Sequence, residues 1–191
     1  YVEEGMPSLA ALAGSQGYET TAFHPYLSSG GNRPIAYQCL SFDHQLYQED
    51  VEDPYLIRRY ISDRSDYETI FDVTGTTSPA FVFNVTMQNH GGYTIPYANF
   101  DQEVWLTGDM EGKYPEADMY LSLVKKSDEA FEWLVNYFSQ CDQPTMIVMF
   151  GDHQPGIEDE FFDEAMGVES TKVPNEQKVC WYETPFVIWT N

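Results

Sequence analysis

Residues 80–87 (A-F-V-F-N-V-T-M) decide the fold class, because the run is β-branched and aromatic almost throughout. Residues 145–150 (T-M-I-V-M-F) repeat this character, and residues 184–191 form a third apolar run. Near-continuous apolar strands are typical of parallel sheets that helices cover on both faces. The sequence therefore predicts an α/β fold with a mainly parallel sheet flanked by helices.

Helical patterns separate these strands. The strongest is 116–140, where apolar or small residues recur at spacings of three and four, namely Tyr120, Leu123, Ser127, Ala130 or Phe131, Leu134 and Phe138. Residues 7–16 predict a helix with Leu9, Leu12 and Ala13 on one face and Gly17 as its stop. A strand is expected at 18–23 and a helix at 66–73 capped by Ser65. Residues 41–64 are expected to be irregular, 91–115 a long loop, and 156–180 mixed and polar.

Composition excludes some classes of protein. Hydrophobic residues make up 42% of the 191 positions, which excludes global disorder. Nine Lys and Arg against 31 Asp and Glu give a net charge of −22, which excludes a broad surface for nucleic acid or anionic lipid. An anionic substrate would need a local metal ion or a placed Arg. The alternative is that the acidity only keeps a secreted or surface domain soluble.

Other sequence features say little about the function of the protein. No apolar run approaches a membrane span, and no signal peptide opens the sequence. Cys39, Cys141 and Cys180 indicate neither a zinc ribbon nor a disulfide framework. The sequon at Asn84 lies in a strand-like run, so it is not expected to be glycosylated. The final strand ends with nothing after it to cover it, so we expect residues 1–191 to be one domain truncated at both ends.

Three of the four histidines follow predicted strands. His24 follows 18–23, His90 follows 80–87, and Asp152-His153 follows 145–150. Parallel strands bring their carboxyl ends to one edge, where ligands bind, so these side chains are expected to converge there. The alternative is that each is a loop histidine bonded to backbone. His44 lies in an irregular acidic stretch and is expected at the surface.

Phe150-Gly151-Asp152-His153 predicts a metal site. A carboxylate and a neutral imidazole on one tight turn can both reach a divalent ion, and this ligand pair suits Mn²⁺ or Zn²⁺ better than Mg²⁺. The alternative is that Asp152 caps a local turn and His153 is merely exposed. Further ligands would have to come from elsewhere.

Two glycine-containing loops predict contacts to an ester. In Asn89-His90-Gly91-Gly92, His90 can donate to an ester oxygen, and the glycines let backbone N–H groups approach. Residues 28–33 (S-S-G-G-N-R) place Arg33 beside a glycine pair, where it can clamp an anion. The alternative is a solvent-exposed Arg33.

Together these segments resemble the lipoteichoic-acid synthase group of the sulfatase/alkaline-phosphatase superfamily. The matching stretches are 17–24 (G-Y-E-T-T-A-F-H), 29–33 (S-G-G-N-R), 84–93 (N-V-T-M-Q-N-H-G-G-Y) and 150–153 (F-G-D-H), in family order. The resemblance implies the C-terminal part of a sulfatase-like catalytic domain. It also implies an enzyme on the extracytoplasmic face of a bacterial membrane, with its anchor upstream.

The resemblance also implies a mechanism and roles. A Thr nucleophile attacks a phosphodiester beside a divalent ion, Mn²⁺ above Mg²⁺, Zn²⁺ or Ca²⁺, and passes phosphoglycerol to an acceptor. Asp152 and His153 would be metal ligands. His90 would contact the phosphoryl group or protonate the leaving oxygen, Arg33 would hold the anionic head group, and His24 would line the pocket.

Two departures from the family pattern limit these expectations. No Thr occurs among the sixteen residues before the 17–24 segment, so the nucleophile is expected to be missing and the chain inactive. Gly31 stands where the family often has Trp, which puts phosphoglycerol specificity in question. The alternatives are a sulfatase or phosphodiesterase acting on a soluble ester, or a non-catalytic module that binds a wall polymer.

Overall fold

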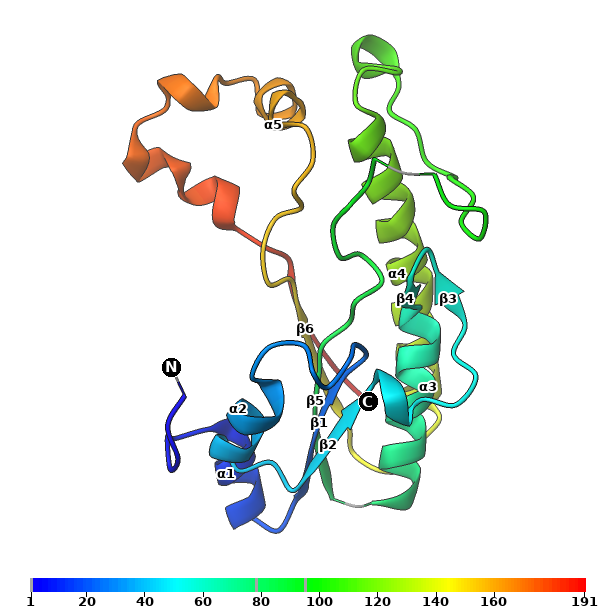
Figure 1. Cartoon of the computed structure of the whole chain (residues 1–191), viewed down its shortest axis with the longest axis vertical. Coiled ribbons are helices and arrows are strands. Elements are labelled where there is room, and N and C mark those ends of the chain that lie inside the picture. Colours follow the sequence, from blue (N-terminus) through cyan, green and yellow to red (C-terminus); the bar gives the residue numbers. More distant parts are fainter. Residues whose placement is uncertain (1, 78, 95) are drawn as a thin grey trace. The chain divides into compact units, whose positions relative to one another are not determined.

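The computed structural model describes residues 2–77, 79–94 and 96–191, with the side chains of Gln177 and Cys180 excepted. The chain forms two compact units, Tyr1–Gln88 and Asn89–Asn191. Figure 1 labels the elements that make up each unit. The predicted single domain 1–191 stays a prediction.

The first unit contains the parallel sheet that the sequence predicts. β1 (Glu19–His24) lies between β2 (His44–Tyr47) and β5 (Ala80–Asn84), and both pairings are parallel. β1 is buried from its second residue to its last, as a central strand covered on both faces must be. The strand predicted at 80–87 is confirmed as far as Asn84, after which the chain leaves the sheet.

Three helices accompany this sheet (Figure 1). α1 (Leu9–Ser15) has Gln16 as its C-cap, and Gly17 follows with φ +89°. The helix stop predicted at Gly17 is therefore confirmed. The predicted apolar face of this helix, with Leu9 and Leu12, is not the buried one. Both leucines are exposed, and Ala10 is buried instead. α2 (Arg33–Cys39) begins at the predicted anion-clamp residue.

The helix predicted at 66–73 is longer, and its cap was wrongly placed. α3 (Asp63–Thr76) is capped by Ser62, whose side chain accepts from the Ser65 N–H at 3.2 Å. Ser62 has extended backbone dihedrals, as an N-cap requires, and Ser65 already lies inside the first turn. The Ser65 hydroxyl accepts instead from the Tyr55 N–H.

The stretch 41–64, predicted to be irregular, holds short regular elements. It contains β2, η1 (Gln48–Asp50), and the antiparallel pair β3 (Leu56–Ile57) and β4 (Tyr60–Ile61). The Asp43 carboxylate accepts from both the N–H and the hydroxyl of Thr20, which fixes β2 beside β1. His44 is the first residue of β2 and pairs with Glu19 at the surface, so its predicted exposure is confirmed.

The second unit is built on α4 (Pro115–Ser139), within one residue of the predicted helix. Its predicted face is confirmed by five buried side chains, those of Leu123, Ser127, Ala130, Leu134 and Phe138. The Glu158 carboxylate accepts from the N–H groups of Glu116 and Ala117 at the first turn. This anion satisfies donors that have no partner within the helix.

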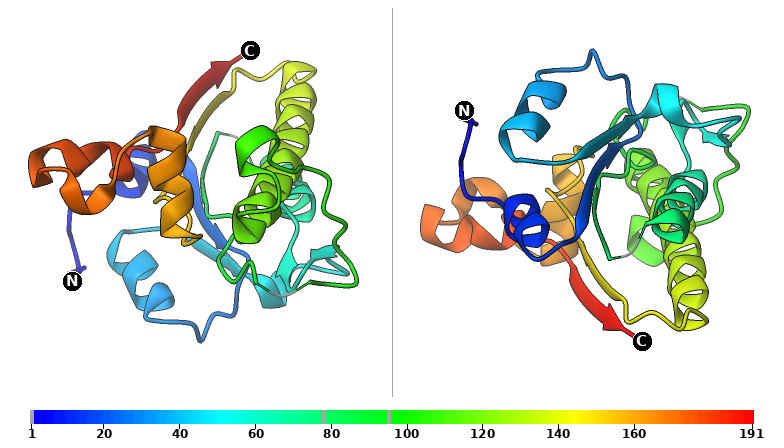
Figure 2. Two further views of the ribbon diagram at one scale, coloured as in Figure 1. Left: turned by 90° about the horizontal axis from the view of Figure 1, so that it is seen from above. Right: turned by 90° about the horizontal axis from the view of Figure 1, so that it is seen from below.

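β6 (Met146–Phe150) and β7 (Phe186–Thr190) confirm the two other predicted strands, but their predicted parallel pairing is wrong, because over the described residues they pair antiparallel with each other in a sheet of their own. The predicted burial of the final strand is wrong, because Phe186, Val187 and Ile188 are all exposed. Figure 2 shows this two-stranded ribbon from two directions. The polar stretch between the strands contains α5 (Asp159–Met166), η3 (Ser170–Lys172) and η4 (Asn175–Tyr182).

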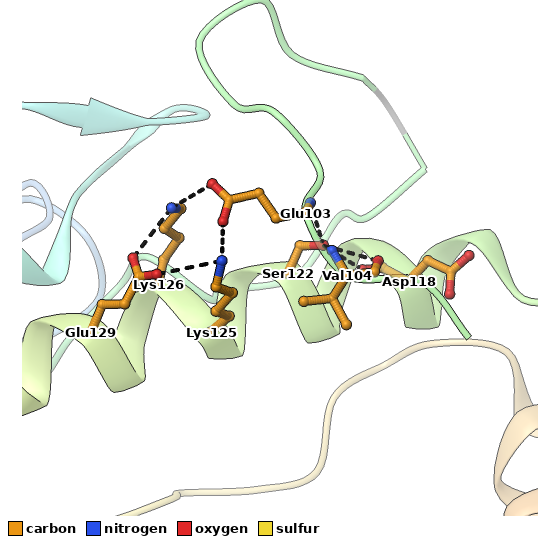
Figure 3. Close-up of polar contacts among 7 residues, drawn as sticks. All are labelled: Glu103, Val104, Asp118, Ser122, Lys125, Lys126 and Glu129. Atoms are coloured by element: carbon orange, nitrogen blue, oxygen red, sulfur yellow. Dashed lines mark hydrogen bonds and ion pairs between the residues drawn. The ribbon is translucent and has the colours of Figure 1, made fainter. Parts of the chain in front are cut away.

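The loop predicted at 91–115 contains one short helix, η2 (Gly108–Met110), and a strap, residues 101–107, that α4 holds (Figure 3). The Ser122 hydroxyl accepts from the N–H groups of Glu103 and Val104 at 3.2 and 2.9 Å. Lys125 and Lys126 pair with the Glu103 carboxylate, and these contacts lower the pKa of Glu103 to about 2. Over the described residues, no helix is both long and apolar enough to cross a membrane.

Candidate functional site

His24 is the last residue of β1 rather than the first residue after it. Its side chain is buried, and its carbonyl accepts from the Tyr26 N–H at 2.7 Å. A buried imidazole at the carboxyl end of a central parallel strand lies where ligands bind in α/β sheets. The position of His24 is therefore suited to a residue that lines a ligand-binding site.

Arg33 begins α2 and is held by the loop that precedes it. The guanidinium donates to the Gly30 carbonyl and lies over the Tyr26 ring, with 5.9 Å from Cζ to the ring centroid. A Cβ on Gly30 would lie 2.5 Å from the guanidinium nitrogen and 3.1 Å from the Leu27 carbonyl oxygen, so a larger residue would displace the guanidinium from its present position. Tyr26 thus links the end of β1 to Arg33, and His24 and Arg33 belong to one local structure.

The Glu49 carboxylate fixes the loop between these two residues. It accepts from the Ser28 N–H at 3.1 Å and from the Ser28 hydroxyl at 2.9 Å. The pKa of Glu49 is lowered mainly by a hydrogen bond from its own backbone N–H, and the hydrogen bonds from Ser28 lower it further. An anion held here keeps the loop in place, so the flexible clamp that the sequence predicts is an anchored one.

In the second unit, the loop of His90 is anchored on both sides of that residue. The Asn89 side chain donates to the Ser127 hydroxyl at 2.9 Å, and the Tyr93 hydroxyl donates to the Asn89 carbonyl at 2.7 Å. The Tyr93 ring packs edge-on against Tyr120 of α4 at 5.7 Å. His90 itself is exposed, so its imidazole faces solvent from a loop that is fixed.

Asp152 and His153 lie on the tight turn after β6, with Gly151 packed against the chain before β7. The Gly151 N–H donates to the Pro185 carbonyl at 3.1 Å, and a Cβ there would meet Thr184 Cβ at 3.1 Å. The Asp152 and His153 side chains are 83% and 74% exposed. Asp152 Oδ1 accepts from the His153 N–H at 2.9 Å, so Asp152 caps this turn, as the alternative interpretation of the sequence expects, while both side chains stay exposed.

One ring nitrogen of His153 is engaged locally. Its Nδ1 lies 2.7 Å from the Gln154 carbonyl, which can only accept, so Nδ1 is the donor in this hydrogen bond and Nε2 is the nitrogen that could bind a metal ion. Nε2 lies 3.5 Å from Asp152 Oδ2. Two ligand atoms about 2.1 Å from a tetrahedral ion lie about 3.4 Å apart, so this separation suits a shared cation. An octahedral ion needs the atoms about 0.5 Å closer, a shift that exposed side chains allow.

These two residues could supply only part of a coordination shell. Within residues 2–77, 79–94 and 96–191, no group of three or more His, Cys, Asp and Glu side chains could hold a metal ion. A structural or catalytic site needs three or four protein ligands. The residues therefore fit a divalent ion as a ligand pair, and any complete site requires further donors.

The predicted residues fall into two groups, one in each unit. In the first unit, His24 and Arg33 meet through Tyr26. In the second, the Tyr120 ring packs against Tyr93 of the His90 loop, and burial and, to a smaller extent, the Asp152 charge raise the pKa of Tyr120. A contact between His90 and the Asp152–His153 pair stays a prediction. Convergence of the two groups on one ligand stays a prediction.

Sequence reasoning missed the residues that hold these groups in place. Tyr26 and Tyr120 carry no motif, and only the Arg33–Tyr26 and Tyr93–Tyr120 contacts show their role. A buried polar pair was also missed, in which the Asn84 amide at the end of β5 donates to Asp66 of α3. An Asn within an otherwise apolar strand was the available signal for that pair.

A parallel sheet with candidate residues at strand ends, together with a carboxylate–imidazole turn after an apolar strand, defines an α/β domain suited to ester chemistry. A family model described as Sulfatase matches residues 2–191, so the chain belongs to the sulfatase family.

Relatives of known sequence are longer than this chain. A Rhizobium meliloti (strain 1021) protein, provisionally named a cyclic beta-1,2-glucan modification protein, is 31% identical over all of this chain and 30% of its own length. The capsular polysaccharide biosynthesis protein RkpI of the same strain is 26% identical over 73% of this chain and 24% of its own length. The chain thus spans less than a third of either relative.

Solved structures share the fold. Listeria monocytogenes lipoteichoic acid synthase LtaP has a TM-score of 0.73 at 21% identity, over 98% of this chain and 47% of its own. Streptococcus pyogenes phosphoglycerol transferase GacH, solved with sn-glycerol-1-phosphate, has a TM-score of 0.67 at 22% identity, over 92% and 44%. The predicted alkaline-phosphatase/sulfatase-like fold is confirmed, and this fold resembles that of the lipoteichoic acid synthase.

Proposed function

We propose that this chain is part of a metal-dependent phosphoglycerol transferase, which takes phosphoglycerol from a phosphatidylglycerol-type lipid and passes it to a cell-surface polymer. The observation that carries the proposal is the Asp152–His153 turn, in which Nε2 and Oδ2 lie 3.5 Å apart on a glycine-packed corner after β6. A carboxylate and an oriented imidazole at that spacing are suited to a divalent ion of a phosphoryl-transfer site.

Asp152 and His153 would hold the ion, which we propose to be Mn²⁺, with Mg²⁺, Zn²⁺ or Ca²⁺ as alternatives. When bound, it would neutralise charge at phosphorus and favour ionisation of the attacking hydroxyl. Two ligands from this chain leave the remaining donors to another part of the protein, together with the nucleophilic threonine that the resemblance implies. We therefore propose that residues 1–191 alone do not turn over substrate.

Arg33 and His24 would bind the anionic end of the substrate. The Arg33 guanidinium keeps donors beyond the one that the Gly30 carbonyl engages, and its stacking on Tyr26 fixes the plane in which they point. His90, exposed on an anchored loop, would donate to a phosphoryl oxygen or protonate the leaving oxygen. These roles need the two units to present their groups to one ligand.

Transfer is favoured over hydrolysis by the kinds of protein that resemble this chain. The two solved structures just described are named a synthase and a transferase, and the two sequence relatives are named for modification or biosynthesis of polysaccharide. A polysaccharide hydroxyl is accordingly the acceptor class we propose. The C-terminal periplasmic domain of Escherichia coli EcEptC, with a TM-score of 0.61 at 18% identity, supports the extracytoplasmic location that we propose.

The test uses the complete natural protein with phosphatidylglycerol vesicles and Mn²⁺, with and without a polysaccharide acceptor. We expect diacylglycerol release together with phosphorylated polymer, and loss of both after Asp152→Asn or His153→Gln. Hydrolysis of an aryl phosphate or aryl sulfate without lipid turnover would replace the transferase by the soluble-ester hydrolase. Polymer binding with no turnover of any ester would leave only a binding module.

A further inference from the structure

Three of the four arginines in the first unit gather on one pair of tyrosine rings. The rings of Tyr26 and Tyr60 lie with their centroids 6.3 Å apart. Arg33 lies over Tyr26, whereas Arg58 and Arg59 lie over Tyr60, with 5.7 and 5.2 Å from Cζ to the ring centroid. We call these five residues the arginine–tyrosine cluster. Residues 1–88 contain no lysine, so the cluster holds most of the positive charge of this unit.

The turn between β3 and β4 presents one of these arginines to solvent. Arg58 and Arg59 are the two residues of this turn, because Ile57 pairs with Tyr60 (Figure 1). Arg58 has φ +57°, a conformation that glycine, asparagine or aspartate usually takes in such turns. Its side chain is buried, and Nη2 donates to the Gln88 carbonyl at 3.2 Å. Arg58 therefore anchors the turn, and Arg59 is the exposed member of the pair.

The contact with Tyr60 restricts where the Arg59 guanidinium lies. Tyr60 is buried and packs against Tyr26, so it is a fixed support for an exposed side chain. A guanidinium whose position is restricted loses less entropy when it binds, and its planar N–H groups match a carboxylate or a phosphate in a bidentate manner. Arg59 is therefore suited to bind an oxyanion.

We propose that Arg59 binds an anionic group of the acceptor, so that the acceptor is an acidic glycan, bearing carboxylate or phosphate groups, rather than a neutral polysaccharide. This inference rests on the proposed function, in which Arg33 of the same cluster holds the anionic end of the donor lipid. The head group of a phosphatidylglycerol-type lipid carries one phosphate. A second oxyanion for the same cluster must therefore come from another molecule, and the acceptor is the other substrate.

The charge of the chain makes such a local cation necessary. A net charge of −22 repels an acidic glycan at long range, so its binding needs arginines placed at the point of contact. The fourth arginine of the first unit, Arg64, instead pairs with Glu68 at 3.5 Å, away from the tyrosine rings. The same net charge disfavours an anionic membrane as the partner of Arg59, because a membrane would meet a broad surface rather than one guanidinium.

The experiment measures by calorimetry how the complete natural protein binds matched acidic and neutral oligosaccharides. One pair is oligogalacturonate and its methyl ester, and the other is an oligomannose 6-phosphate before and after phosphatase treatment. We expect the protein to prefer the acidic member of at least one pair, and Arg59→Gln to weaken binding of that member by about tenfold. The pair that responds identifies the oxyanion as a carboxylate or a phosphate.

Two further variants make the result specific. Arg59→Lys keeps the charge without the bidentate geometry, so it should recover part of the lost affinity. Arg64→Gln is the matched control, because it removes an exposed arginine of the same unit that lies outside the cluster, and it should bind like the unchanged protein. Thermal unfolding should give all three variants a Tm within a few degrees of the unchanged protein, since all three changes are at exposed side chains.

Other outcomes would overturn the proposal. Equal affinity of Arg59→Gln and the unchanged protein for the acidic oligosaccharides would mean that Arg59 only stabilises the hairpin through Tyr60. Weaker binding of Arg59→Gln to vesicles of phosphatidylglycerol and phosphatidylcholine, with no change for the oligosaccharides, would assign Arg59 to a membrane surface. The absence of any preference for the acidic members would exclude an acidic acceptor.

Glycerol 1-phosphate separates this inference from the proposed function. Its affinity should fall in Arg33→Gln and much less in Arg59→Gln. Equal losses in the two variants would show that both arginines serve the head group, which would remove the acceptor subsite and leave the proposed function standing. No loss in Arg33→Gln would instead contradict the proposed head-group clamp.

Discussion

Gly151→Ala tests whether the candidate metal turn depends on its close packing. The added Cβ would lie 3.1 Å from Thr184 Cβ, 3.4 Å from Thr184 Cγ2 and 3.5 Å from Pro185 Cδ. Carbon atoms prefer about 3.5–4.0 Å, so the two chain segments must separate by about 0.4 Å or more. Overpacking costs about 1–3 kcal/mol in a closed core, and this half-exposed corner can relax, so we expect about 1–2 kcal/mol.

The same displacement should disturb the ligand pair, because separation weakens the hydrogen bond from the Gly151 N–H to the Pro185 carbonyl that holds the turn. Thermal unfolding followed by circular dichroism should show Tm lower by about 2–8 °C, using 2–4 °C for each kcal/mol in a chain of this length. In the complete protein, calorimetry should show Mn²⁺ affinity lower by about tenfold, as when support behind a ligand is lost.

Gly156→Ala is the matched control, because it lies in the same loop and a Cβ there meets nothing within 4 Å. Its φ is not positive, so alanine should be neutral or stabilise by about 0.4–1 kcal/mol. A Gly151→Ala protein with the Tm and Mn²⁺ affinity of Gly156→Ala would show that the turn tolerates separation, and the packing argument would fail.

Three further changes test other parts of the structure. Ser122→Ala removes the acceptor for two strap N–H groups, so we expect a loss of about 2 kcal/mol in urea unfolding and faster amide exchange at 103–104, with exposed Ser139→Ala nearly neutral. Burial and, next, the Asp63 charge raise the pKa of Asp66, so its contribution to stability is present below the pKa of the unfolded carboxyl and is lost as pH rises through the folded pKa. Asp66→Asn should remove the part of the stability loss that sets in as pH rises above about 4, the pKa of an unperturbed Asp, and an unchanged profile would contradict it. Residues 1–191 should bind Mn²⁺ only weakly in calorimetry, and Asp152→Asn should weaken binding further, so tight binding unaffected by the substitution would place the metal elsewhere.

The long elements could be predicted from the sequence because their periodicity is repeated many times. α4 was predicted within one residue, and β1, β5 and β6 within one to three. β3 and β4 have two residues each, too few for alternation to show, so 41–64 was interpreted as irregular. Ser62 and Ser65 are both plausible caps by residue type, and only the backbone dihedrals distinguish them.

Burial was harder to predict than secondary structure. The apolar composition of β7 predicted a covered strand, but composition says what a segment favours and not what covers it. The exposed Leu9 and Leu12 of α1 present the same difference on a smaller scale. For the candidate site, residue types and strand ends were sufficient to nominate five residues, whereas the aromatic contacts of Tyr26 and Tyr120 depend on tertiary packing that no local pattern encodes.

The glycines give a physical criterion that separates the stronger site predictions from the weaker one. The sequence places a glycine beside each of Arg33, His90 and Asp152, and residue type alone does not distinguish these three positions. Among the described glycines apart from Gly92, a Cβ would meet neighbours within 4 Å only at Gly30 and Gly151, next to the anion-clamp candidate and the metal candidate. At these two turns a larger residue would displace its neighbours, so packing favours glycine there. Gly91 meets nothing, so the position of His90 rests instead on the hydrogen bonds of Asn89 and Tyr93. Substitutions that remove those hydrogen bonds should therefore affect His90 more than any substitution at Gly91.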